Sequence, residues 1–406
     1  MTSRERIRYA LTRQKVDRIP NGLGGCEATG LHVKAYEKLK RILGVNDSQN
    51  RMYTFMANAV VEPRVLDAMN GDIIILNSWL CPVPLWGKYS KNMWKNQDLW
   101  GEKYQVPIDW AFRTDKDGTI WWENYNLKCP PGGIYFDAVP DDYAKTLHRL
   151  EKPLMPDDYN PPHDIPDDTL RSMQEAARWL YENTDYSICC GECVTDLQMK
   201  PGGMINWWMR LLDEPEVVHE FLHKACEAGI SQMKLVNQAV GKYCDMILLS
   251  DDFGNKEGVM IGPDLWRDIY KPHYKRLYSE YHMITDMKLN FHTCGSVYDI
   301  LGDLIECGVD ILNPVQISAK NMEPQKLKNE FGDRLIFYGG CFDPAITPPP
   351  TSPEIVYETV KRNIKIFSQG GGYIFAGEHN IPGDTPISHL KAIMNAYNDC
   401  CSEYSS

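Results

Sequence analysis

The chain has 406 residues, with 43 Lys plus Arg against 55 Asp plus Glu, so its formal net charge is -12 at pH 7. A composition of 43% hydrophobic and 24% charged residues is ordinary for a globular protein and excludes extensive disorder. No basic block offers the positive surface that phosphate backbones and anionic lipids require, so we expect no binding to nucleic acids or membranes.

The first segment, residues 1–14, is charged and predicted to be helical, unlike a signal peptide. No stretch approaches the roughly 18 to 20 continuous apolar residues that cross a bilayer. We therefore expect a cytoplasmic protein. In that compartment the 13 cysteines are expected to be thiols, most of them in the core.

Eight short apolar runs recur along the chain, with helical stretches between them. They cover Ile19–Gly24, Asp72–Ser78, Ser187–Glu192, Asp245–Ser250, Lys288–His292, Val309–Pro314, Leu335–Gly340 and Tyr373–Gly377. The runs are nearly continuous rather than alternating, which is typical of parallel strands buried on both faces. Eight such strands predict an α/β fold, a (β/α)8 TIM barrel formed by residues 1–406 as one domain.

Three of the intervening helices have clear sequence boundaries. One opens at Asp213 with a first-turn proline and acidic residues. A second follows Cys294, carries apolar residues at helical spacing and ends at Gly308. A third begins at the capping residue Ser352, which a proline follows, and is stopped by the glycines from Gly370 onward.

The second and third runs are too far apart for a single crossover helix, which indicates an insertion. Six of the 11 tryptophans fall in this interval: Trp86, Trp94, Trp100, Trp110, Trp121 and Trp122. Turn signals at residues 115–118 and 130–133 predict a small β meander, a lid over one barrel end at about residues 85–150. Most of the tryptophans are expected to pack within the meander, and one or two could stack on an aromatic ligand.

Ligand-type side chains follow several runs, at the end of a barrel that carries function. His292 and Cys294 follow the fifth run and, because residues i and i+2 share a face, point to one place. Imidazole and thiolate are ligands that zinc prefers, although an isolated pair could also be packed at the barrel mouth without a metal. Other strand ends offer further thiols and carboxylates, which favours a metal: Asp251, Asp252, Cys341, Asp343, Glu378 and His379.

Several blocks together resemble the uroporphyrinogen decarboxylase superfamily. They are Ser3–Arg6, Asp17–Pro20, Asp251–Gly254, Phe291–Ser296, Gly308–Pro314, His379–Ile381 and Asp384–Pro386. The resemblance runs nearly end to end. It implies a β/α barrel with its pocket at the C-terminal face, in agreement with the count of apolar runs.

The superfamily divides by chemistry. True decarboxylases bind an acidic tetrapyrrole through an Arg-rich segment and an aspartate near the N-terminus, whereas residues 22–27 of this chain contain no arginine. The sequence is more similar to the corrinoid-linked methyltransferases, which use zinc. That resemblance implies His292, Cys294 and His379 as ligands, with His379 where thiol-methylating members have cysteine.

The fourth zinc ligand is left open among Cys341, Asp343, Glu358 and Glu378. Asp343 and Glu358 have spacings comparable to those of acidic residues in related O-demethylase components. Glu358 lies inside the third predicted helix, so a solvated or salt-bridged helix residue is an equal interpretation.

The resemblance implies methyl transfer between a small methylated substrate and the cobalt of cobalamin or another corrinoid, carried by a transient partner protein. Imidazole in place of thiolate leaves zinc more Lewis-acidic, which favours a methoxy-aromatic donor over thiol methylation. Glu192 and Asp252, at the ends of the third and fourth runs, are candidate catalytic carboxylates, although Glu192 could merely satisfy backbone donors.

Other readings remain open. They are a metal-independent decarboxylase of a uroporphyrinogen-like or other acidic substrate, a methylcobalamin:thiol methyltransferase, and a binding protein on a degenerate barrel. A homodimer is also left open. The C-x-x-C at Cys190 and Cys193 has no partner pair, so a redox role is not favoured.

Overall fold

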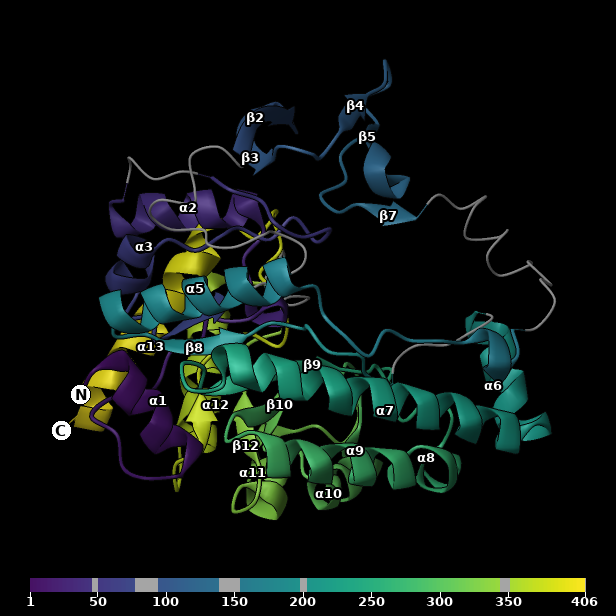
Figure 1. Ribbon diagram of the computed structural model, residues 1–406. Helices are drawn as coiled ribbons and strands as arrows, with labels where there is room; N and C mark the ends of the chain where they lie inside the picture. Colours follow the sequence, from purple (N-terminus) through teal and green to yellow (C-terminus); the bar gives the residue numbers. More distant parts are fainter. Residues whose placement is uncertain (46–49, 77–93, 139–153, 198–202, 344–350, 406) are drawn as a thin grey trace.

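The computed structural model describes residues 1–45, 50–76, 94–138, 154–197, 203–343 and 351–405 (Figure 1). Its centre is a curled parallel sheet with the order β1-β8-β9-β10-β11-β12-β13. The strands are β1 (Ile73–Leu76), β8 (Ser187–Cys190), β9 (Met246–Ser250), β10 (Lys288–His292), β11 (Ile311–Asn313), β12 (Ile336–Tyr338) and β13 (Tyr373–Ile374). The predictions of an α/β fold and a parallel sheet are confirmed.

Successive side chains of each strand join different apolar clusters. In β9, Met246 and Leu248 belong to the cluster on the inner face, whereas Ile247 and Leu249 pack in the larger cluster with the helices. All four are at most 2% exposed. Burial on both faces explains why the runs are continuous in the sequence rather than alternating.

The first predicted strand, Ile19–Gly24, is not a regular strand. Asn21 forms a single parallel bridge with Phe375, and its carbonyl accepts a hydrogen bond from the Asp72 N–H at 2.8 Å. The segment therefore lies between the last strand and the first. The segment turns immediately afterwards, since the Gly25 N–H donates a hydrogen bond to the Gly22 carbonyl at 2.8 Å. A Cβ at Gly22 would come within 2.3 Å of the Tyr338 ring, so the close approach there requires glycine.

Helices surround the sheet, and both chain ends lie beside α1 (Figure 1). They are α1 (Ser3–Leu11), α2 (Val33–Leu43), α3 (Pro63–Ala68), α5 (Asp167–Asn183), α6 (Met204–Asp213), α7 (Pro215–Val240), α8 (Pro263–Ile269), α9 (Lys271–Ile284), α10 (Tyr298–Cys307), α11 (Pro324–Phe331), α12 (Pro353–Phe367) and α13 (Ile387–Ser405). Across the described ranges, no helix is both long enough and apolar enough to span a bilayer.

The three helices with clear sequence boundaries are confirmed as α7, α10 and α12. The Ser352 side chain accepts a hydrogen bond from the Ile355 N–H at the start of α12. Gly308 ends α10 in the left-handed conformation, with φ 111°. These boundaries were readable because capping depends on residues within one turn of the helix end.

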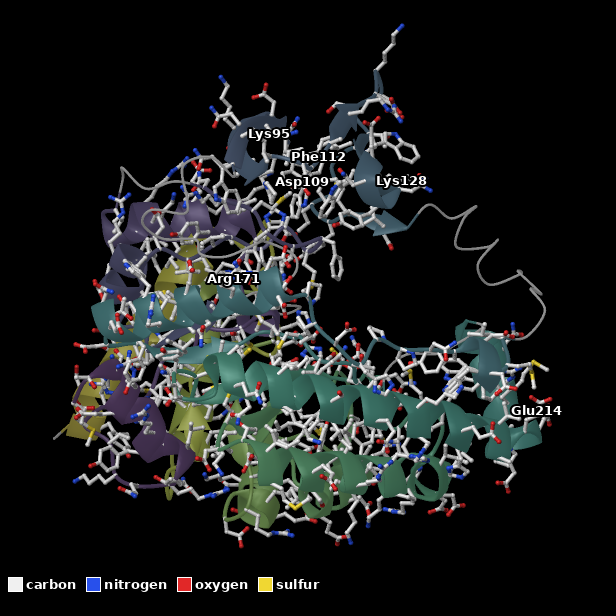
Figure 2. The ribbon with its side chains drawn as sticks, in the orientation of Figure 1. Lys95, Asp109, Phe112, Lys128, Arg171 and Glu214 are labelled. Atoms are coloured by element: carbon white, nitrogen blue, oxygen red, sulfur yellow. The ribbon has the colours of Figure 1, made fainter. Side chains whose placement is uncertain are left out.

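Antiparallel strands lie between β1 and β8 in the chain and stand apart from the parallel sheet (Figure 1). They are β2 (Trp94–Leu99), β3 (Glu102–Pro107), β4 (Phe112–Thr114), β5 (Ile120–Trp122), β6 (Leu127–Cys129) and β7 (Asp137–Ala138). β2 and β3 form one sheet and β4 to β7 another. Asp109, labelled in Figure 2, lies in the connection between the two sheets, and Phe112 begins β4.

The tryptophans of this segment pack largely against one another and their neighbours. Trp110 and Trp122 are at most 2% exposed, and their ring centroids are 4.1 Å apart. Trp100 packs its ring against His32 and Phe136. Trp86 lies outside the described residues.

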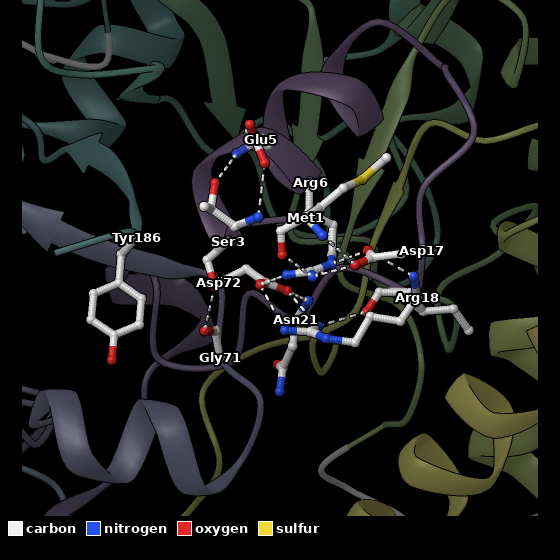
Figure 3. Close-up of polar contacts among 12 residues, drawn as sticks. Met1, Ser3, Glu5, Arg6, Asp17, Arg18, Asn21, Gly71, Asp72 and Tyr186 are labelled. Atoms are coloured by element: carbon white, nitrogen blue, oxygen red, sulfur yellow. Dashed lines mark hydrogen bonds and ion pairs between the residues drawn. The ribbon is translucent and has the colours of Figure 1, made fainter. Parts of the chain in front are cut away.

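An ion network ties α1 to the amino end of β1 (Figure 3). The Asp72 carboxylate is completely buried and accepts hydrogen bonds from Arg6 at 2.6 Å and from Arg18 at 2.7 and 2.8 Å. The Asn21 N–H adds a fourth, at 2.8 Å. The sequence blocks Ser3–Arg6 and Asp17–Pro20 therefore have a structural role, at the end of the sheet opposite the candidate site.

Candidate metal site and its surroundings

Two separate strand ends bring three predicted ligands together. His292 ends β10, Cys294 follows two residues later, and His379 follows β13. Their ligand atoms all lie within 4.8 Å of one another, and each residue is partly buried. The Cys294 Sγ is 3.5 Å from His292 Nε2, and the two imidazole centroids are 5.8 Å apart. The structure thus places the three residues in one group; whether they hold zinc stays a prediction.

The chemistry of these side chains suits a metal cation. Burial lowers the pKa of His292 to about 4, so its imidazole is neutral and has a lone pair to offer at neutral pH. Burial raises the pKa of the Cys294 thiol. A cation beside this sulfur would favour the thiolate, which is the form that binds a metal. Two imidazoles and one thiolate are a donor set that zinc accepts.

An amide pair orients His379. The His379 Nδ1 lies 2.5 Å from the Asn380 side-chain oxygen, so a neutral ring donates its Nδ1 proton there and keeps Nε2 as the lone-pair nitrogen. The Asn380 side-chain amide in turn donates to Asn58 at 3.3 Å. Sequence analysis missed both asparagines. Asn380 could have been suspected as the neighbour of a candidate ligand, whereas Asn58 gave no signal.

Asp252 contacts the same group. Its carboxylate accepts a hydrogen bond of 2.8 Å from the Cys294 N–H and lies 3.6 Å from His292 Nε2. The side chain is 55% exposed, so it stands at the rim of the group. Its neighbour Asp251 is completely buried and accepts a hydrogen bond from the Tyr274 hydroxyl, which gives Asp251 a structural role.

Glu192, the other candidate carboxylate, lies in the loop after β8. Burial raises the pKa of its carboxyl, a hydrogen bond with Ser250 lowers it, and the Asp252 charge raises it further. Ser250 is paired with His292 in the register of β9 and β10. Glu192 is therefore connected through Ser250 to the strand that carries His292.

Glu192 also lines a cavity of about 630 Å³. Much of the wall is apolar and comes from the segment before α5, from α5 itself and from the loop after β8: Tyr159, Pro161, Pro162, Ile165, Met173 and Val194. No lysine or arginine occurs among its described lining residues. Such a wall suits an uncharged ligand with an apolar body.

Within the described ranges, the other candidate ligands do not join His292, Cys294 and His379, which together are called the metal group below. Cys341 is completely buried. The Glu378 carboxylate accepts hydrogen bonds from the backbone and hydroxyl of Ser318, at 2.8 and 2.9 Å. Glu358 is exposed on α12, as the helix-surface interpretation expected. Asp343 lies in the described loop after β12, near enough to Glu378 to raise the pKa of that carboxyl.

The antiparallel segment reaches the site through a tyrosine that sequence analysis did not single out. Tyr135 forms a side-chain hydrogen bond with Asn380, and burial raises its pKa to about 12. Its ring meets His32 edge-on at 5.6 Å. The tryptophans had drawn attention to the segment, but the phenol can both pack and hydrogen-bond at the site.

The chain is similar to known proteins in sequence and in fold. The family model described as Uroporphyrinogen decarboxylase (URO-D) matches residues 197–400. Two curated relatives from Methanosarcina barkeri, one of them from strain Fusaro / DSM 804, are both named Methylcobamide:CoM methyltransferase MtaA. They are 23% and 22% identical over 189 residues, 46% of this chain and 50% of each relative. The chain thus spans about half the length of the curated relatives it matches.

Among solved structures, a methyltransferase from Methanosarcina mazei has a similar fold, with a TM-score of 0.55 at 16% identity. The match covers 98% of this chain and 99% of that one.

Proposed function

Because the chain belongs to the uroporphyrinogen decarboxylase family, we propose that it is a zinc-dependent methyltransferase. It moves a methyl group between a small methylated substrate and the cobalt of a corrinoid held by a partner protein. The observation that carries the proposal is the meeting of His292, Cys294 and His379 within 4.8 Å. The names of the two curated relatives support methyl transfer and a methylcobamide.

The proposal includes a specific architecture. We take the Asn21 bridge to Phe375 as the eighth position of a closed (β/α)8 barrel, with the antiparallel segment as a lid inserted into this single domain. The hydrogen bond between Tyr135 and Asn380 supports the lid, because it joins the segment to a residue beside His379.

Three protein ligands would leave one position of a tetrahedral zinc open. Zinc bound there would supply Lewis acidity to an oxygen or sulfur of the substrate. Asn380 orients the His379 ring, and Asp252 holds the Cys294 backbone by its hydrogen bond. Glu192, whose pKa burial raises, can hold a proton for the leaving oxygen of an ether.

We favour a methoxy-aromatic donor in the cavity beside Glu192. A guaiacol-type ether has an apolar ring and one weakly polar side, which matches a largely apolar wall that carries the carboxyls of Glu192 and Asp196. The absence of lysine and arginine from the described lining weighs against an acidic tetrapyrrole, and so against the decarboxylase alternative.

A thiol acceptor is the second candidate. The curated relatives carry coenzyme M in their names, which favours methyl transfer from a methylcobamide to a thiol. His379 favours the ether, since exchanging thiolate for imidazole makes zinc a stronger Lewis acid and a weaker activator of a bound thiolate. The two candidate functions, ether demethylation and thiol methylation, use the same metal group and differ in the reaction that it supports.

One experiment decides between the candidates. The purified protein is analysed for metal and then assayed with cob(I)alamin and methoxy-aromatics, methylamines or methyl thioethers, while the visible spectrum is followed for methylcobalamin. We expect about one zinc per chain and the fastest reaction with the ethers. Faster methylation of thiols by methylcobalamin would reverse the order of the candidates. Metal-independent release of CO2 from an acidic substrate would overturn both.

A further inference from the structure

The two cysteines of the C-x-x-C sequence meet at the wall of the cavity that Glu192 lines. Cys190 ends β8, and Cys193 lies in the loop that follows. Their sulfur atoms are 3.6 Å apart. Cys190 is completely buried, whereas Cys193 is partly exposed and lines the cavity of about 630 Å³. One thiol is thus within reach of a small molecule in the cavity, with the other directly behind it.

From this geometry we propose that Cys190 and Cys193 form a redox-active dithiol, which a hydroperoxide converts to a disulfide in the cavity wall. Sequence analysis did not favour a redox role because the pair has no second C-x-x-C. A dithiol that forms its own disulfide needs no second pair, only two sulfurs close enough to bond.

Little movement separates the two states. A disulfide bond is about 2.05 Å long, so the sulfurs must approach by roughly 1.5 Å. The loop is anchored on both sides of Cys193. The Gly191 N–H donates to the Leu76 carbonyl at 2.8 Å, and the Thr195 N–H donates to the Gln232 side chain at 2.5 Å. Cys193 lies between these anchors, in irregular backbone that is free of strand pairing.

The neighbouring cysteines are less suited to the reaction. Cys189 belongs to the apolar cluster on the other face of the sheet, as the alternation along β8 requires. Cys244 is buried and is a second neighbour of Cys190. Hydrogen bonds from the Cys193 and Cys244 thiols lower the pKa of Cys190, which suits its sulfur to attack an oxidised Cys193. Because Cys190 is completely buried, the thiol that meets a peroxide in the cavity is Cys193.

The reaction balances with one hydroperoxide per dithiol. The Cys193 sulfur in the cavity wall attacks a peroxide oxygen and loses its proton, the O–O bond breaks, and the departing oxygen takes up a proton and leaves as water or an alcohol. The sulfenic acid so formed on Cys193 is attacked by the Cys190 sulfur, which loses its proton and displaces water as the S–S bond closes. Two thiols are oxidised by two electrons, and the peroxide is reduced.

The new bond closes a ring that contains Glu192. The Glu192 carboxyl is hydrogen-bonded to Ser250 on β9, which pairs with His292 on β10. Closing the ring therefore shifts the Glu192 carboxyl relative to β10. This consequence rests on the proposed function, in which Glu192 serves methyl transfer. The disulfide itself does not.

Mass spectrometry tests the disulfide on the purified 406-residue chain after incubation with zinc. Reduced protein is treated with hydrogen peroxide, the remaining thiols are alkylated, and the protein is digested with trypsin. Cys189, Cys190 and Cys193 fall in one peptide, residues 179–210, because trypsin does not cleave between Lys200 and Pro201. We expect this peptide to lose about 2 Da and to carry an alkyl group only on Cys189. Cys193→Ser should abolish the loss, and Cys189→Ala should leave it unchanged.

The outcomes separate the proposal from its consequence. Peptides in which Cys190 and Cys193 both remain alkylated after peroxide would overturn the proposal, and so would a disulfide between Cys190 and Cys244. Cys244→Ser distinguishes that second case, since it should still form the proposed bond. A further outcome is that the disulfide forms, but neither peroxide nor later reduction with dithiothreitol changes the rate of methyl transfer by the wild-type enzyme. In that case the proposed effect on Glu192 is wrong, whereas the proposal of a redox-active dithiol is upheld.

Discussion

Cys294 donates its backbone N–H to the Asp252 carboxylate at 2.8 Å, and the same carboxylate oxygen lies 3.6 Å from His292 Nε2. One acidic side chain thus contacts both residues of the His-x-Cys pair. It holds the loop after β10 in the conformation that turns Cys294 toward His292. Asp252 is therefore placed to position the two candidate ligands, and its role as a catalytic carboxylate stays a prediction.

The first prediction concerns Asp252. Asp252→Asn keeps an oxygen for the Cys294 N–H but removes the negative charge beside the ligands. We expect zinc affinity to fall by about 10- to 100-fold, as for other groups that orient metal ligands. Competition with a chromophoric chelator measures it. Asp264→Asn, at a side chain that is 95% exposed, is the matched control. Equal affinity in both variants would refute the role of Asp252.

The second prediction tests the ligands themselves. Cys294→Ser and His379→Ala should each reduce bound zinc from about one per chain to a small fraction, because both remove a ligand from a three-residue group. Elemental analysis of folded protein measures it. Cys341→Ala changes another cysteine after a strand, one outside the group, and should retain the metal. Full zinc in both ligand variants would place the site elsewhere.

The third prediction concerns the base of the fold. Asp72→Asn removes a buried carboxylate that Arg6 and Arg18 share, and leaves Arg6, whose side chain is 6% exposed, paired with the more exposed Asp17. Breaking a buried ion pair from one side should lower the free energy of unfolding by about 3 to 5 kcal/mol. Urea denaturation measures the loss. Glu403→Gln removes a carboxylate that pairs with two lysines at the surface and should have only a small effect, because solvent screens that pair.

The fourth prediction is a pH dependence. Burial lowers the pKa of Lys328 to about 8, and the charge of Arg13 acts in the same direction. The pKa of an unfolded lysine is about 10.4, so between roughly pH 8 and 10.4 the unfolded chain binds more protons than the folded one. Stability attributable to this group therefore rises with pH in that window, and is lost as the pH falls through about 8.

Lys328→Met removes the titration and makes this effect measurable. The stability of the wild type relative to the variant should increase by roughly 2 kcal/mol from pH 7 to pH 10, measured by urea denaturation at each pH. The amine also donates to the Gly371 carbonyl at 2.7 Å, so the variant loses that bond at every pH and only the trend is diagnostic. A constant difference across this range would contradict the prediction.

The fifth prediction concerns the corrinoid partner. A docked partner presents its cofactor in a fixed orientation, so methyl transfer with a corrinoid protein should exceed that with the same concentration of free cobalamin by about tenfold or more. Initial rates at matched cobalt concentration measure the ratio. Equal rates would show that the cofactor alone is recognised, without its protein.

What the sequence determined by itself is what depends on near neighbours. The continuous run Met246–Leu249 predicted a strand buried on both faces, and Ser352 and Gly308 marked helix ends, because periodicity and capping act within a few residues. The pairing of His292 with Cys294 is local in the same sense, since the two are separated by one residue. The family resemblance added His379.

Tertiary structure decided what depends on distant segments. His379 joins the pair only because the sheet curls so that the residues after β13 approach the end of β10, and Asn58 and Tyr135 approach the site from parts of the chain that carry no motif. The first apolar run bends away after one bridge, since Tyr338 fills the space beside Gly22. Such contacts follow from how side chains fill a shared interior, and no local pattern records which distant residue will fill it.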